Sequence, residues 1–152
     1  SNIKDYVLTQ SQMEYVWEHF GGSIWEIYTL IGDFLKVCAN GQVEDQKMKE
    51  IVEQHMLQAR SYFEEYAVLD DPKTELLREI NKYIQDRGFV NELDLKRLLK
   101  QEFYADKKSL QSELHYLVCN NFLYYNPTFA KYKLQGKSME IGFDLFIKKV
   151  AD

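Results

Sequence analysis

The chain contains little of what several protein classes require. Its 152 residues include only two cysteines, two prolines and seven glycines, and its apolar runs are far shorter than the roughly 20 residues of a membrane-spanning helix. These shortages exclude a collagen-like and a membrane-spanning protein. Hydrophobic residues make up 45% of the chain and charged residues 28%, which excludes a disordered protein and lets a core form without disulfide support.

The two cysteines and the N-terminus of the chain lead to expectations about its location and its extent. Cys38 and Cys119 lie in apolar helical contexts, and neither belongs to a CxxC or Cys/His cluster. We therefore expect two buried free thiols, no metal site, a cytoplasmic location and no membrane partner. The chain has no charged-then-apolar leader, and it starts at Ser1 rather than Met, so we expect it to be a segment of a longer protein.

Residues 1–69 carry helical patterns only. Thr9 or Ser11 fits the cap of a first helix, since each stands three residues before Gln12 or Glu14. Apolar residues then recur as one buried helical face requires, at Met13, Val16, Trp17 and Phe20. Gly21-Gly22-Ser23 ends this helix and starts a second, Asn40-Gly41 ends the second, and a third is expected at about 42–67.

The pattern changes at Asp70-Asp71-Pro72, where Asp71 fits a helix cap and Pro72 the first helical position. After it, helices are predicted at about 72–87, 91–103 and 106–121, β-like runs at 122–125 and 132–135, and a last helix capped by Ser138. Three helices and a hairpin follow one another in this order in a winged helix-turn-helix. The predicted fold class is therefore mainly α, with a helical subdomain at 1–69 and a winged-helix domain at 70–152.

No motif predicts catalysis by this chain. Gly136-Lys137-Ser138 matches the end of a phosphate-binding loop, but Lys131 stands where that loop needs its first glycine. The three histidines fit neither H-E-x-x-H nor a Ser/His/Asp signature, and no carboxylate pair carries a sign of burial. We expect no enzyme activity, no catalytic residue and no cofactor in the chain taken alone.

Positive charge gathers on the predicted third helix of the winged helix and on its hairpin. Residues 106–137 have a net charge of +3, from five lysines and two acids, whereas residues 1–105 have a net charge of −7. In DNA-binding winged helices these two elements meet the major groove and the phosphates. The candidate DNA- or partner-binding residues are Lys107, Lys108, Ser109, Gln111, Ser112, His115, Lys131, Lys133 and Lys137.

Two other interpretations of this charge stay open. Winged helices also dock proteins, and lysines on a hairpin protect its edge from mispairing. Arginine, which makes the commonest bidentate contact to guanine, does not occur within residues 106–137. The sequence therefore leaves both a DNA partner and a protein partner possible.

Trp17 and Trp25 flank the Gly21-Gly22 turn. Both fit a helical face, so core packing is the first interpretation. The alternative is that the turn brings backbone close to a ligand or to a neighbouring domain.

Two sets of strings resemble one protein family. Leu8-Thr9-Gln10-Ser11-Gln12, Tyr15-Val16-Trp17 and Gly21-Gly22-Ser23-Ile24-Trp25-Glu26-Ile27 are similar to the helical lid of archaeal-type (AAA/STAND-like) P-loop ATPases. Phe122-Leu123-Tyr124-Tyr125-Asn126-Pro127 and Tyr132-Lys133-Leu134-Gln135 resemble the terminal hairpin of the winged helix that follows this lid. The order of elements covers nearly the whole chain.

The resemblance implies a parent protein whose ATPase core, with its Walker A and B strands, ATP and Mg²⁺, precedes the chain. It also implies that Gly21, Gly22 and Trp25 contact that core. Our first hypothesis is the C-terminal, non-catalytic part of an ATP-dependent switch, which binds DNA or a protein partner. The second is a free-standing DNA-binding regulator that uses residues 1–69 for dimerisation or for binding an effector.

Overall fold

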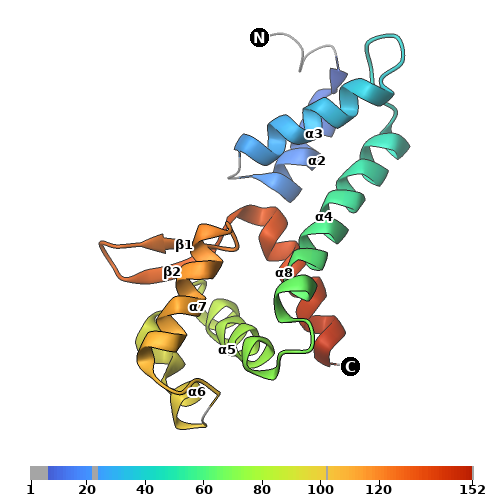
Figure 1. Ribbon diagram of the computed structural model, residues 1–152. Helices are drawn as coiled ribbons and strands as arrows, with labels where there is room; N and C mark the ends of the chain where they lie inside the picture. Colours follow the sequence, from blue (N-terminus) through green and yellow to red (C-terminus); the bar gives the residue numbers. More distant parts are fainter. Residues whose placement is uncertain (1–6, 22–23, 102, 152) are drawn as a thin grey trace. The chain divides into compact units, whose positions relative to one another are not determined.

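Helices dominate the computed structural model, which describes residues 7–21, 24–101 and 103–151 (Figure 1). The prediction of a mainly α chain with a short hairpin is confirmed. In chain order the elements are α2 (Gln10–Phe20), α3 (Ile24–Val37), α4 (Asp45–Ala67), α5 (Asp71–Arg87), the 3₁₀ segment η1 (Glu92–Leu95), α6 (Lys96–Lys100), α7 (Lys107–Cys119), β1 (Leu123–Asn126), β2 (Lys131–Leu134) and α8 (Gly136–Ala151).

The chain divides into two compact units. The first unit holds Ser1–Ser61 and Gly136–Asp144, and the second holds Tyr62–Gln135 and Leu145–Asp152. The helices α4 and α8 therefore each contribute residues to both units. The domain boundary expected between residues 69 and 70 stays a prediction.

Local capping chemistry sets most helix ends. Thr9 caps α2, and its hydroxyl accepts from the Gln12 N–H while the Gln12 side chain accepts from the Thr9 N–H. Asp106 caps α7 as predicted, and Gly88 ends α5 with a φ of 82°, in the left-handed region that glycine tolerates. The cap of α5 is Asp70 and not the expected Asp71, because the Asp70 side chain accepts from the Lys73 N–H.

The expected role of Ser138 as a helix cap is wrong. The helix α8 already begins at Gly136, so Ser138 lies inside its first turn, where it is buried. Its hydroxyl donates to the carboxylate of Glu26 on α3, within the first unit. Burial, which outweighs this hydrogen bond and the charge of His55, raises the pKa of Glu26.

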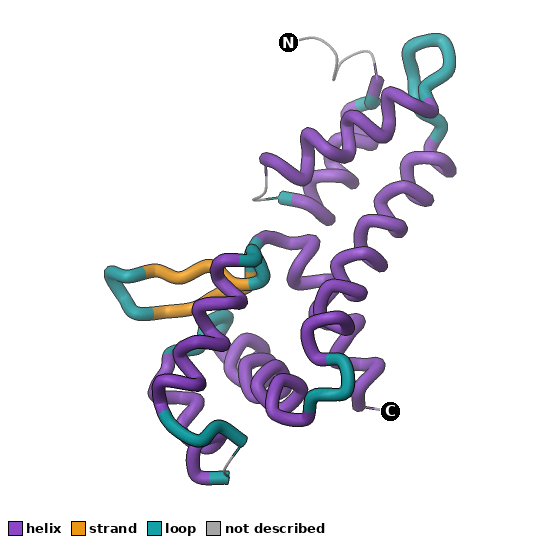
Figure 2. The backbone as a smooth tube through the Cα atoms, viewed as in Figure 1, coloured by secondary structure: helices purple, strands orange, loops and turns teal. Residues whose placement is uncertain are grey.

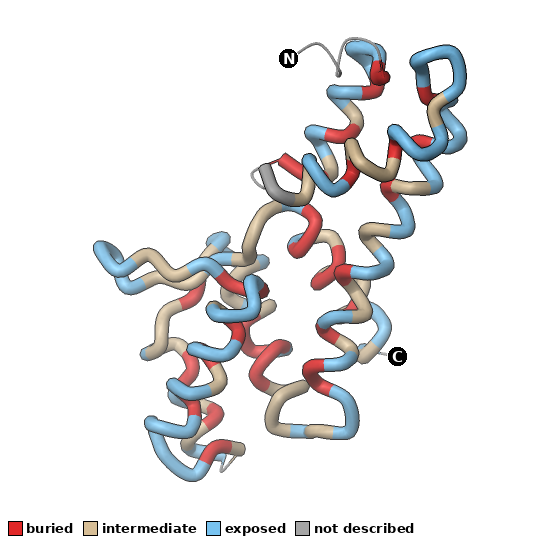
Figure 3. Tube along the Cα trace, turned by 45° about the horizontal axis from the view of Figure 1, so that its top comes forward, coloured by how far each residue is buried: buried red, intermediate tan, exposed pale blue. Residues whose placement is uncertain are grey.

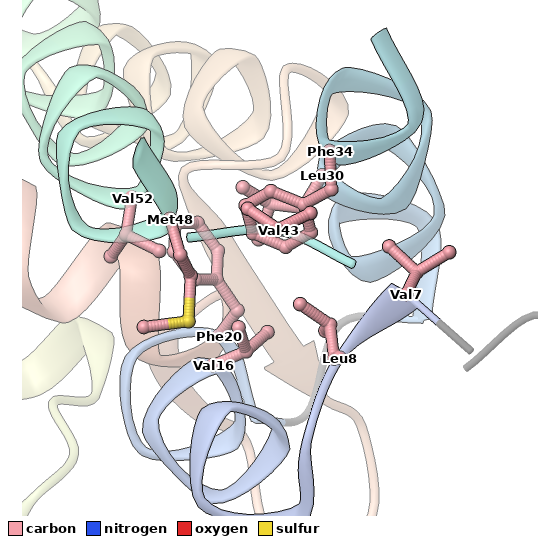
Figure 4. Close-up of a cluster of buried hydrophobic side chains, with 9 residues drawn as sticks. All are labelled: Val7, Leu8, Val16, Phe20, Leu30, Phe34, Val43, Met48 and Val52. Atoms are coloured by element: carbon pink, nitrogen blue, oxygen red, sulfur yellow. The ribbon is translucent and has the colours of Figure 1, made fainter. Parts of the chain in front are cut away.

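The core of the first unit lies where α2, α3 and α4 meet. Figure 4 shows Val16 and Phe20 of α2 near Met48 and Val52 of α4, with Leu30 and Phe34 of α3 close by. The expectation for α2 is only partly right. Val16 and Phe20 are buried, but Met13 and Trp17 are 36% and 59% exposed, so they do not belong to the core.

The second unit is built around the hairpin and its contacts with the helices that precede it. The strands β1 and β2 pair antiparallel as predicted, with Tyr125 opposite Tyr132 (Figure 2). A further bridge joins Val90 to Tyr132, through hydrogen bonds of 3.0 and 2.8 Å between their backbones. Buried residues alternate with exposed ones along the helices (Figure 3), and the buried ones in α5–α7 include Leu76, Leu77, Ile80, Leu95, Leu98, Leu110, Leu114 and Leu117.

An ion pair between the buried carboxylate of Glu79 and the partly exposed guanidinium of Arg97 holds α5 to α6. Arg97 donates to one carboxylate oxygen of Glu79 from Nε at 3.0 Å and from Nη2 at 2.5 Å, and Lys82 donates to the same oxygen at 3.2 Å. Burial by itself raises the pKa of Glu79. The hydrogen bonds and charges of Arg97 and Lys82 outweigh burial, so the pKa lies below the ordinary value of 4.5.

We predict opposite effects on stability for two Gly→Ala substitutions. A Cβ at Gly142 of α8 would lie 2.6 Å from the Cβ of Ala59, so Gly142→Ala is expected to lower the free energy of unfolding by about 1–3 kcal/mol. A Cβ at Gly32, inside α3, meets nothing within 4 Å, so Gly32→Ala is expected to raise it by about 0.5–1 kcal/mol. Urea denaturation of both variants checks this, and equal effects would contradict the close approach of α8 to α4.

The Glu79 pair predicts a pH-dependent stability. Glu79→Gln is expected to cost about 1–3 kcal/mol at neutral pH, because it removes a charged acceptor from a buried site. Since the folded pKa is depressed, the carboxylate stabilises fully above 4.5, and this contribution is lost as the pH falls through the folded pKa. The difference between wild type and variant, measured by urea denaturation at several pH values, should therefore shrink in acid. Glu75→Gln is the control, since Glu75 lies 3.9 Å from Arg97 and is more exposed than Glu79. An equal loss of unfolding free energy in both variants would contradict a stabilising role specific to the Glu79 carboxylate.

Candidate partner-binding surface

The N-terminus of α7 presents two of the predicted lysines. Asp106 fixes this end of the helix, because its Oδ1 accepts from the Ser109 N–H at 2.7 Å and from the Ser109 hydroxyl at 2.9 Å. These hydrogen bonds hold the pKa of Asp106 below its ordinary value. Lys107 and Lys108 occupy the first turn, where positive charge opposes the helix dipole. Helix stability therefore does not account for their presence.

The outward face of α7 carries all six of its predicted residues. Lys107, Lys108, Ser109, Gln111, Ser112 and His115 are exposed, while Leu110, Leu114 and Leu117 point into the core. Among the described residues, no acidic group lies within ion-pair distance of Lys107 or Lys108. The side chains of this face are therefore available to a partner.

The imidazole of His115 lies beside the thiol of Cys119, the last residue of α7. The Sγ of Cys119 lies 3.3 Å from His115 Nε2. Cys119 is exposed and Cys38 is half-buried, so the expectation that both thiols are buried is wrong, although both are free.

The hairpin holds its two lysines in different environments. Lys133 is exposed on β2. Lys131 is half-buried, with its ammonium group 3.9 Å from the ring centre of Phe89 and 5.4 Å from that of Phe129. Lys131 therefore packs against the ring of Phe89, which precedes the bridged residue Val90, and against the ring of Phe129 in the hairpin turn.

Arg87 also lies over the ring of Phe89, although no sequence pattern indicates this contact. Its guanidinium lies 4.4 Å from the ring centre of Phe89 and 5.0 Å from that of Tyr83, and it pairs with Asp94. The sequence pattern around Arg87 indicates only the end of a helix. The segment that follows Arg87 reaches the hairpin through the bridge between Val90 and Tyr132, which no local pattern predicts. Arg87 thus adds a guanidinium beside Lys131, held by Asp94 and by two aromatic rings.

A hollow of about 480 Å³ lies beside α7. Its lining consists of Glu92, Gln111, His115, Val118, Tyr125 and Tyr132. The rings of Tyr125 and Tyr132 meet edge to face, with their centres 4.7 Å apart. Burial, followed by the charges of Tyr125 and Glu92, raises the pKa of Tyr132 to about 12, so its phenol is protonated at neutral pH. The hollow therefore offers a partner two tyrosine rings, an imidazole, an amide and a carboxyl group.

A hydrogen bond joins the last turn of α4 to α7. The hydroxyl of Tyr66 donates to Glu113 at 2.6 Å, and the Tyr66 ring stacks on Tyr116 with centres 5.6 Å apart. Burial, and then the bond to Glu113, raise the pKa of Tyr66, so its phenol remains a donor. All three residues belong to the second unit.

The remaining predicted site residues lie elsewhere. Lys137 is an exposed residue in the first turn of α8, in the first unit, so its grouping with the other eight residues stays a prediction. Its N–H donates to the carbonyl of Gly21 at 3.4 Å. Gly21 caps the C-terminus of α2, and a Cβ there would lie 2.7 Å from the carbonyl oxygen of Trp17. This close approach gives Gly21 a structural reason to be glycine.

Gly22 and the side chain of Trp25 lie outside the described residues, so the expected contacts of Gly21, Gly22 and Trp25 with an ATPase core stay predictions. Within the described ranges, no three His, Cys, Asp or Glu side chains are grouped as a metal site would require. No helix in those ranges combines the length and apolar composition needed to cross a bilayer.

Comparison with known proteins gives no family for this chain. No protein-family model, curated protein or solved structure matches it. The function must therefore be inferred from the surface of α7 and the hairpin, and from the resemblance of the lid and hairpin strings.

Proposed function

We propose that this chain is the C-terminal, non-catalytic part of an archaeal-type P-loop ATPase, in which a winged helix binds duplex DNA and a helical lid links that binding to the nucleotide state. The Val90–Tyr132 bridge is the observation that best supports a winged helix. It adds a third, short β segment beside the hairpin, in the order α5, bridge, η1 and α6, α7, β1, β2. The lid and its ATPase parent are supported by the resemblance of the strings around Gly21-Gly22.

In this proposal α7 is the recognition helix. Lys107 and Lys108 contact phosphates at its N-terminus, where the exposed ammonium groups lack acidic partners among the described residues. Gln111 and Ser112 follow one turn later on the same face and reach base edges. Lys133 of β2 contributes a phosphate contact from the wing.

The link to the nucleotide state runs through α4. This helix begins in the first unit, and Tyr66 in its last turn binds Glu113 of α7 in the second. A change at the lid that moved the end of α4 would therefore act on the recognition helix through one hydrogen bond and one stacked ring. ATP and Mg²⁺ belong to the core of the parent protein and not to this chain.

A protein partner is the second candidate for the same surface. Exposed aromatic rings favour it: Tyr116 is 48% exposed, Tyr124 52% and Phe129 65%. Aromatic residues are enriched in protein interfaces. The two exposed lysines in the first turn of α7 favour DNA, and binding measurements distinguish the two partners.

We predict salt-dependent binding of duplex DNA that requires the first turn of α7. Lys107→Gln and Lys108→Gln are expected to weaken binding for all DNA sequences, and each should lower the slope of log K against log salt concentration by about one unit. Fluorescence anisotropy with a labelled duplex measures this. Lys47→Gln on α4 removes the same charge from another exposed helix position and should have no effect. Undetectable binding at low salt would overturn the DNA proposal in favour of a protein partner.

The ATPase parent makes a prediction about the gene. The coding sequence upstream of Ser1 should contain a β-strand pattern followed by G-x-x-x-x-G-K-[ST], because the core must precede the lid. Sequencing of the locus checks this. A reading frame that starts within a few residues of Ile3 would contradict the switch and leave the free-standing DNA-binding regulator as the better hypothesis.

A further inference from the structure

The helix α2 has two apolar faces. Val16 and Phe20 point into the core of the first unit, but Met13 and Trp17 are 36% and 59% exposed. A tryptophan exposed to this degree contributes nothing comparable to core burial. Its ring is instead available for an interface, where tryptophan is enriched among the residues that dominate binding energy.

Trp17 lines a groove. An open depression of about 710 Å³ runs along α2, and a narrower pocket of about 90 Å³ lies against α3. The residues Leu8, Met13 and Trp17 line both. The narrower pocket is lined throughout by apolar or aromatic side chains, which are Leu8, Met13, Val16, Trp17, Ile27 and Ile31. A partner side chain placed there would be surrounded by apolar groups from two helices.

Acidic residues border the open part of the groove. Glu14 and Glu18 line it and stand four residues apart on α2, where like charges destabilise a helix. Neither has an ion-pair partner among the described residues. The first unit has eleven acidic and six basic residues, a net charge of −5, whereas the second has thirteen of each. The surroundings of the groove therefore favour a cationic partner.

We propose that the α2–α3 groove binds an amphipathic helix of a partner protein, one that carries Lys or Arg beside an apolar anchor. A helix suits the groove because its floor is apolar and formed by two helices, which is the setting of helix-in-groove recognition. The apolar anchor fills the narrower pocket beside Trp17, and the basic residues meet Glu14 and Glu18. A symmetric pairing of two copies through this face is disfavoured, because it would bring the carboxylates of both copies together.

This site goes beyond the proposed function. It lies in the first unit, whereas the proposed DNA surface lies on α7 and the hairpin in the second. If the chain does not bind DNA, the groove proposal therefore still stands. If the groove binds no peptide, the DNA proposal still stands.

The test uses two designed peptides and the whole chain. One peptide has about 18 residues of Leu and Lys, with Leu at the i, i+3, i+4 and i+7 positions of a helix, and the other has Glu in place of Lys. Fluorescence anisotropy of the labelled peptides is measured near 150 mM salt, where weak surface attraction is screened. The Leu/Lys peptide is expected to bind and the Leu/Glu peptide not to bind. Trp17→Ala should weaken binding by at least about tenfold.

Two further variants keep the proposal falsifiable. Glu14→Lys combined with Glu18→Lys should reverse the preference and favour the Leu/Glu peptide, without touching the core. Tyr28→Ala is the matched control, because Tyr28 is a 68% exposed aromatic residue of α3 that is not among the residues that line the groove. Equal binding by Trp17→Ala and Tyr28→Ala, or an unchanged preference after charge reversal, would overturn the proposal. Self-association that Trp17→Ala abolishes in sedimentation velocity would also overturn it, by making a second copy the occupant.

Discussion

Two backbone hydrogen bonds between Val90 and Tyr132 anchor the hairpin to the rest of the second unit. A two-stranded hairpin alone is at best marginally stable in water, so this bridge gives the strands a fixed neighbour. It also brings Phe89 under Lys131 and Arg87 beside them. The grouping of Arg87, Phe89 and Lys131 therefore depends on a contact between segments about 40 residues apart in the sequence.

The helix α7 has a buried apolar face and an exposed polar face. Its leucines fill the core, and Glu113 on its flank receives the hydroxyl of Tyr66. The remaining face is left to Lys107, Lys108 and Gln111 in solvent. In the proposed DNA complex, α7 held in this way from behind and from the side presents its outward side chains in one orientation, which lowers the entropy lost on binding.

The sequence predicted several local features because local chemistry decides them, although the caps expected at Asp71 and Ser138 were wrong. Thr9 and Asp106 cap helices through bonds that span three residues, and Gly88 ends a helix because its backbone adopts a positive φ. The outward face of α7 was equally accessible to prediction, since a leucine stripe at helical spacing fixes which side chains point away. Pairing of the two short strands followed from their aromatic and alternating composition.

By itself the sequence determined the helical character, the hairpin and the exposed lysines of α7, all of which follow from contacts within a few residues. Tertiary structure alone decided that Ser138 binds Glu26, that Arg87 and Lys131 share the ring of Phe89 and that Trp17 faces solvent. Periodicity shows that a residue belongs to an apolar stripe, but burial depends on whether another element covers that stripe. On α2 the apolar stripe is wider than the core that α3 and α4 provide, so its uncovered edge, Met13 and Trp17, lines a groove.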